Sequence, residues 1–337
     1  MYRIGIDLGG TNIAAGVVDE GQHIVAEVSL PTGAERPAEA VVADICRAAE
    51  KAMEKAGITA AHCASVGIGS PGTCDSANGV VVRAYNLGWF NVPVCSMVTA
   101  RLGLPCRLSN DANCAALAET VAGGAVGCRN MILITLGTGV GGGIVADGQL
   151  LEGVGGTGAE VGHTVLVLDG EDCTCGRKGC WEAYASATAL IRQGKRAAAA
   201  QPESLLAGYG EGLTGKDVFD AAAAGDAAAQ AVVDRYCVYV AAGITDLVNI
   251  LGPEKVLIGG GISRQGERLL APVRRYVEKN CFGGPEGVRR GKGELAARRG
   301  PFPLSPRRSW ATRPVSSAQP RCEQEGIFNG RPGWQAA

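Results

Sequence analysis

Side chains that bind soft metal ions are concentrated between residues 163 and 182, in the segment HTVLVLDGEDCTCGRKGCWE. One imidazole and three thiols come from His163, Cys173, Cys175 and Cys180. This donor set suits tetrahedral Zn²⁺, and four protein ligands close the coordination shell, so the metal would be structural. Gly176 and Gly179 let the backbone fold tightly enough for the last two cysteines to face one centre. The sequence therefore predicts a structural zinc site.

Other uses of these cysteines stay open at the level of sequence. They include free cysteines in a loop, a disulfide and a redox pair. The chain has 13 cysteines, an odd number scattered over 337 residues. The start MYRIGIDLGG lacks the pattern of a signal peptide, so we expect none and expect a reducing compartment. That compartment disfavours a disulfide, and the segment lacks the Cys-x-x-Cys spacing of redox motifs.

A glycine turn near the N-terminus contains residues suited to binding phosphate. In YRIGIDLGGTN a short apolar strand ends at Asp7, and the turn then supplies Gly9, Gly10, Thr11 and Asn12. A second strand follows, so the pattern is a hairpin and not the strand–turn–helix of a dinucleotide-binding fold. Glycine lets backbone N–H groups approach a phosphate, the polar side chains add donors, and Asp7 could hold Mg²⁺ through water. The segment could also be only a hairpin turn.

The same pattern recurs about 130 residues later, which suggests an internal repeat. In NMILITLGTGVGGGIVADGQLL an apolar strand, a glycine turn and a second strand again follow one another. The turn supplies Gly137, Thr138, Gly139, Gly141 and Gly142. A third turn, with Gly260 and Gly261, ends a strand in PEKVLIGGGIS. We expect two related α/β domains that face each other across a cleft, with phosphate between their loops.

Two polar residues stand where a strand passes into a helix in PCRLSNDANCAALAE. Asn110 and Asp111 open that helix, and the simplest interpretation of Asp111 is a helix cap.

The composition of the chain excludes some partners. Its net charge of −1 gives no electrostatic reason to bind nucleic acid or an anionic membrane. The most apolar stretch, MILITLGTGVGGGIVA, is too short and too glycine-rich to span a membrane, so we expect a cytoplasmic protein without such partners.

The chain contains six motifs whose order resembles the order of motifs in one protein family. They are DLGGTN, SNDANCAALAE, LGTGVGGG, GAEVGH, CTCGRKGCWE and PEKVLIGGG. This order is similar to that of the ROK family of sugar kinases and sugar-responsive repressors, and within it to the bacterial glucokinases. The resemblance covers residues 2–282. It implies an actin-like ATPase fold of the hexokinase type, with α/β domains at residues 1–117 and 118–282 and with ATP and sugar in the cleft between them.

The resemblance also implies a role for each motif. Asp111 would be the base that accepts the proton of the sugar hydroxyl as it attacks the γ-phosphate of ATP. Because a carboxylate with a reference pKa of about 3.9 is a weak base, it would act mainly by orientation. The sugar would be bound by Asn110, Glu160, His163 and Glu182, with further contacts from the loops at Gly72 and Asn86. Both glycine loops would bind the ATP phosphates together with Mg²⁺, and the turn at residues 260–261 would lie against adenosine.

In this arrangement the zinc would fix the loop between Glu160 and Glu182, and one ring nitrogen of His163 would remain for the sugar. Simpler alternatives stay open: the two glutamates could be ordinary surface charges, and residues 72 and 86 could lie in ordinary loops. Many relatives carry a second asparagine where this chain has Tyr85, so one wall of the sugar pocket would differ.

Other members of the family suggest other functions. The repressors bind DNA through a domain before the first glycine loop, and here that loop follows Asp7, so we expect a kinase. Fructose and N-acetylmannosamine are the main alternatives to glucose, because hexoses differ by only one or two hydroxyl contacts. A non-catalytic sugar sensor is the alternative from another class. We expect a homodimer.

The resemblance stops in the C-terminal tail, residues 283–337. This part is rich in Arg, Pro, Ser and Gly and shows no helix or strand periodicity, where relatives have a final helix that packs on the first domain. Back-translation of residues 309–320 in another reading frame permits Gly-Asn-Glu-Ala-Gly-Ile-Ile-Gly-Ala-Ala, which resembles the missing segment. We therefore expect a frameshift between residues 283 and 304; a disordered extension is the alternative.

Overall fold

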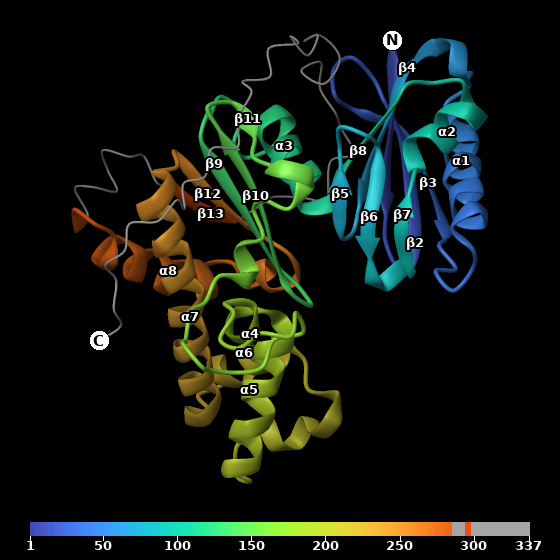
Figure 1. Cartoon of the computed structure of the whole chain (residues 1–337). Helices are drawn as coiled ribbons and strands as arrows, with labels where there is room; N and C mark the ends of the chain where they lie inside the picture. Colours follow the sequence, from blue (N-terminus) through green and yellow to red (C-terminus); the bar gives the residue numbers. More distant parts are fainter. Residues whose placement is uncertain (285–293, 298–337) are drawn as a thin grey trace, which may run out of the picture. The chain divides into compact units, whose positions relative to one another are not determined.

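The computed structural model describes residues 1–284 and 294–297, which belong to one compact unit that runs from Met1 to Pro306 (Figure 1). Among the described residues the strands are β1 (Tyr2–Leu8), β2 (Asn12–Val18), β3 (Ile24–Pro31), β4 (Cys63–Ser70), β5 (Thr73–Asp75), β6 (Val80–Ala84), β7 (Trp89–Val92), β8 (Cys106–Asn110), β9 (Met131–Leu136), β10 (Val140–Ala146), β11 (Gln149–Leu150), β12 (Lys255–Gly259) and β13 (Glu294–Ala297).

Helices lie between groups of strands along the chain. The α-helices are α1 (Ala38–Lys55), α2 (Val94–Leu102), α3 (Asp111–Ala122), α4 (Glu182–Ala185), α5 (Ala187–Ala200), α6 (Gly215–Ala223), α7 (Ala227–Leu251) and α8 (Glu267–Asn280). Within the described residues 182–251, α4 to α7 follow one another without a strand between them. The short 3₁₀ segments are η1 (Ala60–His62), η2 (Tyr85–Leu87), η3 (Val154–Gly156), η4 (Val161–His163), η5 (Leu205–Gly212) and η6 (Gly261–Gln265).

Two five-stranded sheets repeat one topology. Their strand orders are β3-β2-β1-β4-β8 and β11-β10-β9-β12-β13. In each, the central strand forms an antiparallel hairpin with the next strand, β1 with β2 and β9 with β10. On its other side the central strand has two parallel neighbours in succession. The repeat predicted from the two glycine turns is therefore present. A three-stranded sheet, β5-β6-β7, follows β4.

Parallel pairing brings the predicted loops to one edge of each sheet. In the first sheet Asp7 pairs with Gly69, and Ser70 pairs with Asn110 on the strand beyond. Asp7 and Asn110 thus lie two strands apart at the carboxyl ends, about 10 Å at ordinary strand spacing. In the second sheet Gly259 pairs with Thr135, which brings the turn after β12 beside the glycine loop after β9.

Each sheet has its own apolar core. Helix α1 packs on β2 and β3 because Val41, Ile45 and Ala48 recur at helical spacing and are fully buried. In the second half the long helix α7 packs against α6 and α8, and its Tyr236 meets Phe219 of α6 edge to face. Helix α3 contacts β10 so closely that a Cβ on Gly143 would lie 2.5 Å from Ala116 Cβ.

The structure bears on two expected regions, the domain boundary at residue 117 and the C-terminal tail. The expected domain boundary at residue 117 lies inside α3, the helix that follows the first sheet and packs on the second. In the tail, β13 lies within a segment for which we expected no regular structure; it pairs with β12 and buries Leu295. The expected frameshifted segment at residues 309–320 lies outside the described residues.

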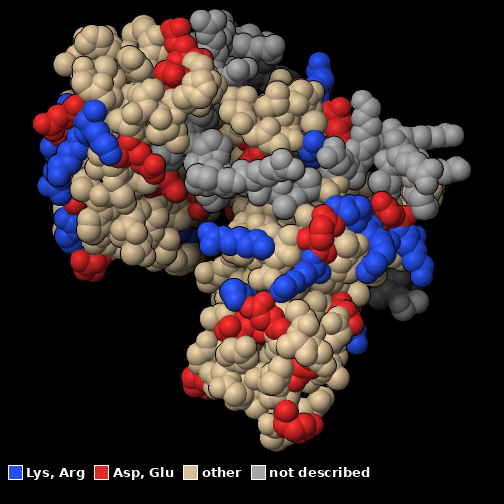
Figure 2. All heavy atoms as spheres, turned by 180° about the vertical axis from the view of Figure 1, so that it is seen from behind, with Lys and Arg blue, Asp and Glu red and all other residues tan. Residues whose placement is uncertain are grey.

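The surface charge and the apolar character of the helices can be compared with the composition of the chain. On the face in Figure 2, acidic and basic side chains are interspersed over the described surface, as a net charge of −1 suggests. Within residues 1–284 and 294–297, no helix combines the length and the apolar character that crossing a bilayer requires.

Candidate active site

A cavity of about 390 Å³ brings most of the predicted site residues together. The predicted residues on its wall are Asn110, Asp111, Gly137, Thr138, Gly139, Gly141, Gly142, Glu160, His163, Glu182 and Gly260. They come from the end of β8, the start of α3, the β9–β10 loop and β10, η4 and the residue before it, the start of α4 and the turn after β12. The other predicted residues do not line this cavity; they are Asp7, Gly9, Gly10, Thr11, Asn12, Gly72, Asn86, Cys173, Cys175, Cys180 and Gly261.

Asn110, not Asp111, caps α3. The Asn110 side-chain oxygen accepts hydrogen bonds from Ala112 N (2.9 Å) and Asn113 N (3.4 Å), and its amide donates to Gly72 O (3.0 Å). Asp111 Oδ1 accepts a local bond from Ala112 N (2.7 Å). Because the capping role falls to Asn110, the simplest alternative for Asp111 is removed, and its carboxylate is left at the cavity wall.

The pKa of the Asp111 carboxyl is raised above its ordinary value. Desolvation is the main cause, and the negative charges of Asp7 and Glu160 add to it, while the hydrogen bond from Ala112 opposes it. The residue is open to solvent through the cavity, but protein surrounds it at longer range, so the desolvation effect persists. Burial also raises the pKa of Asp7. Acidic groups gathered in this way are typical of functional sites that bind cations or protons.

The first glycine turn forms the predicted hairpin beside the cavity. Gly9 N donates to Asn12 O (2.9 Å), and a Cβ on Gly10 would meet the Asn86 amide at 3.4 Å. Thus Gly10 and Asn86 are neighbours, although they are 76 positions apart in the sequence. Gly72 adopts a φ of 84°, and a Cβ there would lie 2.1 Å from Arg83 O, so only glycine fits this turn.

Close packing requires most glycines of the second loop. A Cβ would lie 2.2 Å from Glu182 Oε2 at Gly139, and 2.4 Å from Val161 Cγ2 at Gly142. Gly137 differs, because nothing lies within 4 Å of its ideal Cβ position. Its freedom from side-chain packing leaves room for a ligand to approach the backbone, which is the use predicted for this loop.

The four predicted metal ligands meet at one point. The ligand atoms of His163, Cys173, Cys175 and Cys180 all lie within 4.8 Å of one another. Cys173 Sγ is 3.7 Å from His163 Nδ1, and Cys175 Sγ is 3.6 Å from Cys180 Sγ. Tetrahedral Zn²⁺ with ligand bonds of roughly 2.0–2.3 Å requires separations of this size, so the donor set fits zinc. The backbone N–H of Arg177 also lowers the pKa of the Cys175 thiol to about 6, which favours the thiolate.

Glycine geometry shapes the cysteine loop as predicted. Gly176 and Gly179 have φ values of 86° and 76°, and a Cβ on Gly179 would lie 1.7 Å from Val167 O. Glu182 then connects this loop to the glycine loop: its Oε2 accepts from Val140 N (3.0 Å), and its Oε1 accepts from the Thr174 hydroxyl (3.2 Å).

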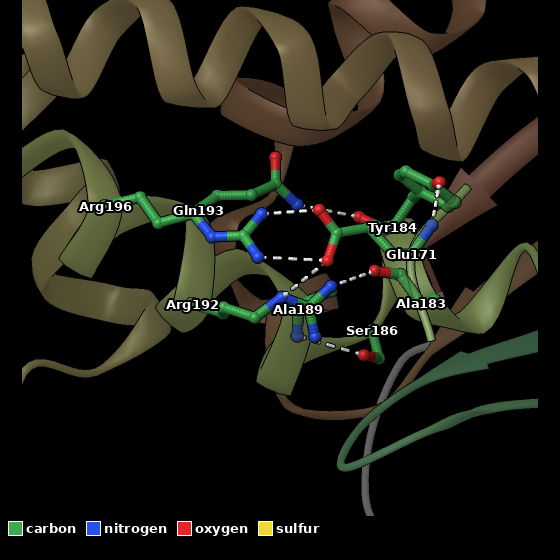
Figure 3. A network of polar contacts seen from close by, with 8 residues as sticks. All are labelled: Glu171, Ala183, Tyr184, Ser186, Ala189, Arg192, Gln193 and Arg196. Atoms are coloured by element: carbon green, nitrogen blue, oxygen red, sulfur yellow. Dashed lines mark hydrogen bonds and ion pairs between the residues drawn. The ribbon is translucent and has the colours of Figure 1, made fainter. Parts of the chain in front are cut away.

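An ion network holds the start of the cysteine loop against α5 (Figure 3). The Glu171 carboxylate pairs with both terminal nitrogens of Arg196, at 2.5 and 3.0 Å, and lies 3.7 Å from Arg192 Nε. Its backbone N–H donates to the Tyr184 hydroxyl at 2.6 Å. Side-chain hydrogen bonding to Arg196 lowers the pKa of Glu171, so the carboxylate stays ionised. The loop is therefore fixed at both ends, by Glu171 and by Glu182.

Comparison with known proteins identifies the family. A model of the ROK family matches residues 3–294. The chain belongs to the ROK family.

Three ROK relatives show the extent of the similarity. A glucokinase of Halalkalibacterium halodurans is 40% identical over 281 residues, which are 82% of this chain and 85% of the relative. A glucokinase of Streptomyces coelicolor is 42% identical over 287 residues, which are 83% and 88%. The crystal structure of a ROK family glucokinase from Streptomyces griseus, in complex with glucose and AMPPNP, is 38% identical. It has a TM-score of 0.72 and a match that covers 88% of this chain and 94% of that one.

These similarities confirm the predicted family and fold class. The ROK match reaches residue 294, further than the 282 expected from the motifs, and β13 begins at that residue. The fold is the actin-like ATPase fold of the hexokinase type, in which two related α/β halves surround a cleft. Which of these ROK residues contact substrate stays a prediction.

The sequence analysis did not predict two residues, Asn113 on the cavity wall and Glu152, which binds the strand before Asp111. Asn113 lines the cavity, is 5% exposed, and its side-chain oxygen has no hydrogen-bond partner in the part of the chain that is described. It lies one helical turn after Asn110, and this spacing in NDAN could have revealed it. Glu152 forms hydrogen bonds to two serines that are 76 and 43 positions away, and no local pattern announces such contacts.

Proposed function

We propose that this chain transfers the γ-phosphate of ATP to glucose and forms glucose 6-phosphate, with Asp111 as the base. The observation that carries the proposal is the cavity, whose wall joins Asp111 to the second glycine loop and to Glu160 and Glu182. A base, a phosphate-binding loop and acceptors for sugar hydroxyls are the groups that such a transfer needs. The H. halodurans and S. coelicolor relatives are both named glucokinase.

Asp111 would orient the attacking hydroxyl and accept its proton late, as the new O–P bond forms. Because desolvation and neighbouring charges raise its pKa, this carboxylate holds the proton more tightly than an exposed aspartate would. Asn110 keeps the base in place, since the same side chain caps α3 and holds the loop at Gly72. The hydroxyl proton therefore moves to a fixed acceptor.

The sugar would lie against the acidic side of the cavity. Carboxylate oxygens of Glu160 and Glu182 accept hydrogen bonds from neighbouring hydroxyls, and an analogue without a hydroxyl leaves such an oxygen unsatisfied. Cys173 faces Nδ1 of His163, so Nε2 remains for a sugar oxygen. We place Asn110, Asn86 and the loop at Gly72 at the rim of this pocket, since the last two adjoin Gly10 and Asn110.

ATP would bind between the glycine loops. In this proposal the phosphates lie on backbone N–H groups of residues 9–12 and 137–142, with Thr11 and Thr138 as further donors, and adenosine lies against the turn at Gly260 and Gly261. Mg²⁺, when bound, offsets the charge of the phosphates, and Asp7 would hold it through water. Closing the cleft would exclude water, so that sugar and not water receives the phosphoryl group.

Zinc would be structural in this enzyme. His163 and the three cysteines would bind it, and Glu171 and Glu182 would fix the same loop without metal. The zinc would hold Glu160, His163 and Glu182 in one arrangement before the sugar binds. We further propose two domains, residues 1–117 and 118–282, a homodimer, and a place in glycolysis in the cytoplasm.

A coupled ADP-release assay over a panel of hexoses tests the function. We expect ADP release with glucose to exceed that with fructose and N-acetylmannosamine, because each hexose presents different hydroxyls to Glu160 and Glu182. A preference for another hexose would still support a sugar kinase, but with that hexose as its substrate. Sugar binding without ADP release from any hexose would indicate the non-catalytic sensor instead.

A further inference from the structure

Glu152 joins three segments of the site that come from different parts of the chain. It follows β11 and begins the segment of residues 152–160, which ends at Glu160. One carboxylate oxygen, Oε1, accepts hydrogen bonds from the hydroxyls of Ser109 (2.5 Å) and Ser76 (2.7 Å). Ser109 lies on β8, two residues before Asp111, and Ser76 lies in the turn after β5.

The two serines differ in burial: Ser109 is buried, and Ser76 is half-buried. Ser109 is 1% exposed, so its hydroxyl needs a partner within the protein, and Glu152 is that partner. Ser76 follows β5, which starts directly after Gly72, the residue whose carbonyl accepts from Asn110. One carboxylate thus contacts the strand that leads to Asp111 and the turn after β5, the strand that begins next to Gly72.

The segment that starts at Glu152 is itself tightly folded. Gly158 N donates to the Glu152 carbonyl (2.7 Å), and Gly153 and Gly156 adopt φ values of 70° and 72°. A Cβ on Gly156 would lie 1.8 Å from Cys74 O, so the segment presses on β5 without a side chain between them. Gly156, Gly158 and Glu160 all line the cavity. Movement of Glu152 would therefore move the cavity wall.

We propose that Glu152 is a positioning residue for sugar binding: its carboxylate ties the segment that carries Glu160 to the strand that leads to Asp111. The inference rests on the proposed glucose phosphorylation. Both bonds come from neutral hydroxyls, so the group acts as a doubly used acceptor and not as half of an ion pair. A glutamine can keep such an acceptor, and an alanine cannot, which makes the two substitutions distinguishable.

Steady-state kinetics of full-length variants tests the proposal. For Glu152→Ala we expect KM for glucose to rise about tenfold while KM for ATP stays within about twofold, because the loss concerns placement of the sugar side. Glu152→Gln should restore most of the glucose KM, since its side-chain oxygen still accepts from both serines. Glu203→Ala, at an exposed position remote from the cavity wall, is the matched control and should behave as wild type.

A double-mutant cycle with Ser109→Ala separates positioning from general destabilisation. If the two side chains act through one bond, Glu152→Ala combined with Ser109→Ala should raise the glucose KM little more than Glu152→Ala alone. Hydrogen exchange should also speed up in residues 152–160 of Glu152→Ala. Additive effects, an unchanged glucose KM, or an equal loss for glutamine and alanine would each overturn the proposal. Failure of wild type to phosphorylate glucose would instead overturn the proposed function, and the exchange result would still test the contact.

Discussion

Replacing Asp111 by asparagine should separate its chemical role from its structural one. The amide has nearly the same shape, and its oxygen can keep the 2.7 Å bond from Ala112 N, so α3 should begin as before. What disappears is the negative charge and the capacity to accept a proton. General-base catalysis contributes about 10²–10⁴ in rate, which corresponds to about 3–5 kcal/mol of barrier. We expect kcat to fall by that factor, with the glucose KM within several-fold of wild type.

Asp111→Asn should stabilise the folded protein, although it lowers kcat. The pKa of Asp111 is raised in the folded protein by desolvation and by Asp7 and Glu160, so its ionised form destabilises the fold at neutral pH. Asp111→Asn should therefore raise Tm at pH 7. The gain should shrink as pH falls through the folded pKa and vanish below about 3.9, where the carboxyl is protonated in both states.

Asp226→Asn is a matched control with the opposite sign. Asp226 caps α7, and the hydrogen bond from Ala229 N (2.7 Å) lowers its pKa, so its ionised form stabilises the fold. This variant should keep full activity and gain no stability at pH 7. Coupled kinetics at neutral pH and thermal unfolding from about pH 3 to pH 8 measure both variants, so that the unfolding series passes below the reference pKa of about 3.9. Near-normal turnover of Asp111→Asn, or a lower Tm at pH 7, would refute the reasoning.

The remaining predictions concern the metal, the glycine loop and the tail. Cys175→Ser should lose zinc, lower Tm and weaken glucose affinity together, whereas Cys128→Ser, outside the cluster, should do none of these; chelation without effect on affinity would contradict the site. Gly137→Ala should keep Tm and raise KM for ATP, because its Cβ meets only open space, whereas Gly142→Ala should lower Tm through its 2.4 Å clash with Val161; equal Tm losses would count against a phosphate role. Resequencing the gene over residues 283–304 should reveal a displaced frame, and an intact frame whose alternative reading does not encode the expected helix would reject that idea.

Local pattern was sufficient where glycine or cysteine spacing alone determines the geometry. The hairpins at residues 9–12 and 137–139 follow from glycine turns between apolar strands, and their recurrence predicted the repeated sheet. The cysteine cluster follows from ligand spacing within 18 residues, where two glycines with positive φ close the loop. These features depend on backbone conformation that neighbouring residues decide.

Long-range placement could not be predicted in this way. Strand β13 has four residues, which are too few to show a periodicity in the sequence. It is recognised only through its pairing with β12. The distribution of roles between Asn110 and Asp111 depends on where Gly72 presents its carbonyl. The distance between Asp7 and Asn110 is set by pairing of both strands with β4, which neither segment encodes by itself. The bonds of Glu152 join segments that only the folded chain brings together.

The most direct test of the central claim is ³¹P NMR of the full-length protein with ATP, Mg²⁺ and glucose. The account predicts that the γ-phosphate resonance of ATP is replaced by glucose 6-phosphate and ADP in equal amounts, and that Asp111→Asn shows almost none of this conversion. Release of inorganic phosphate without a sugar phosphate, or equal conversion by the variant, would contradict phosphoryl transfer to glucose with Asp111 as the base.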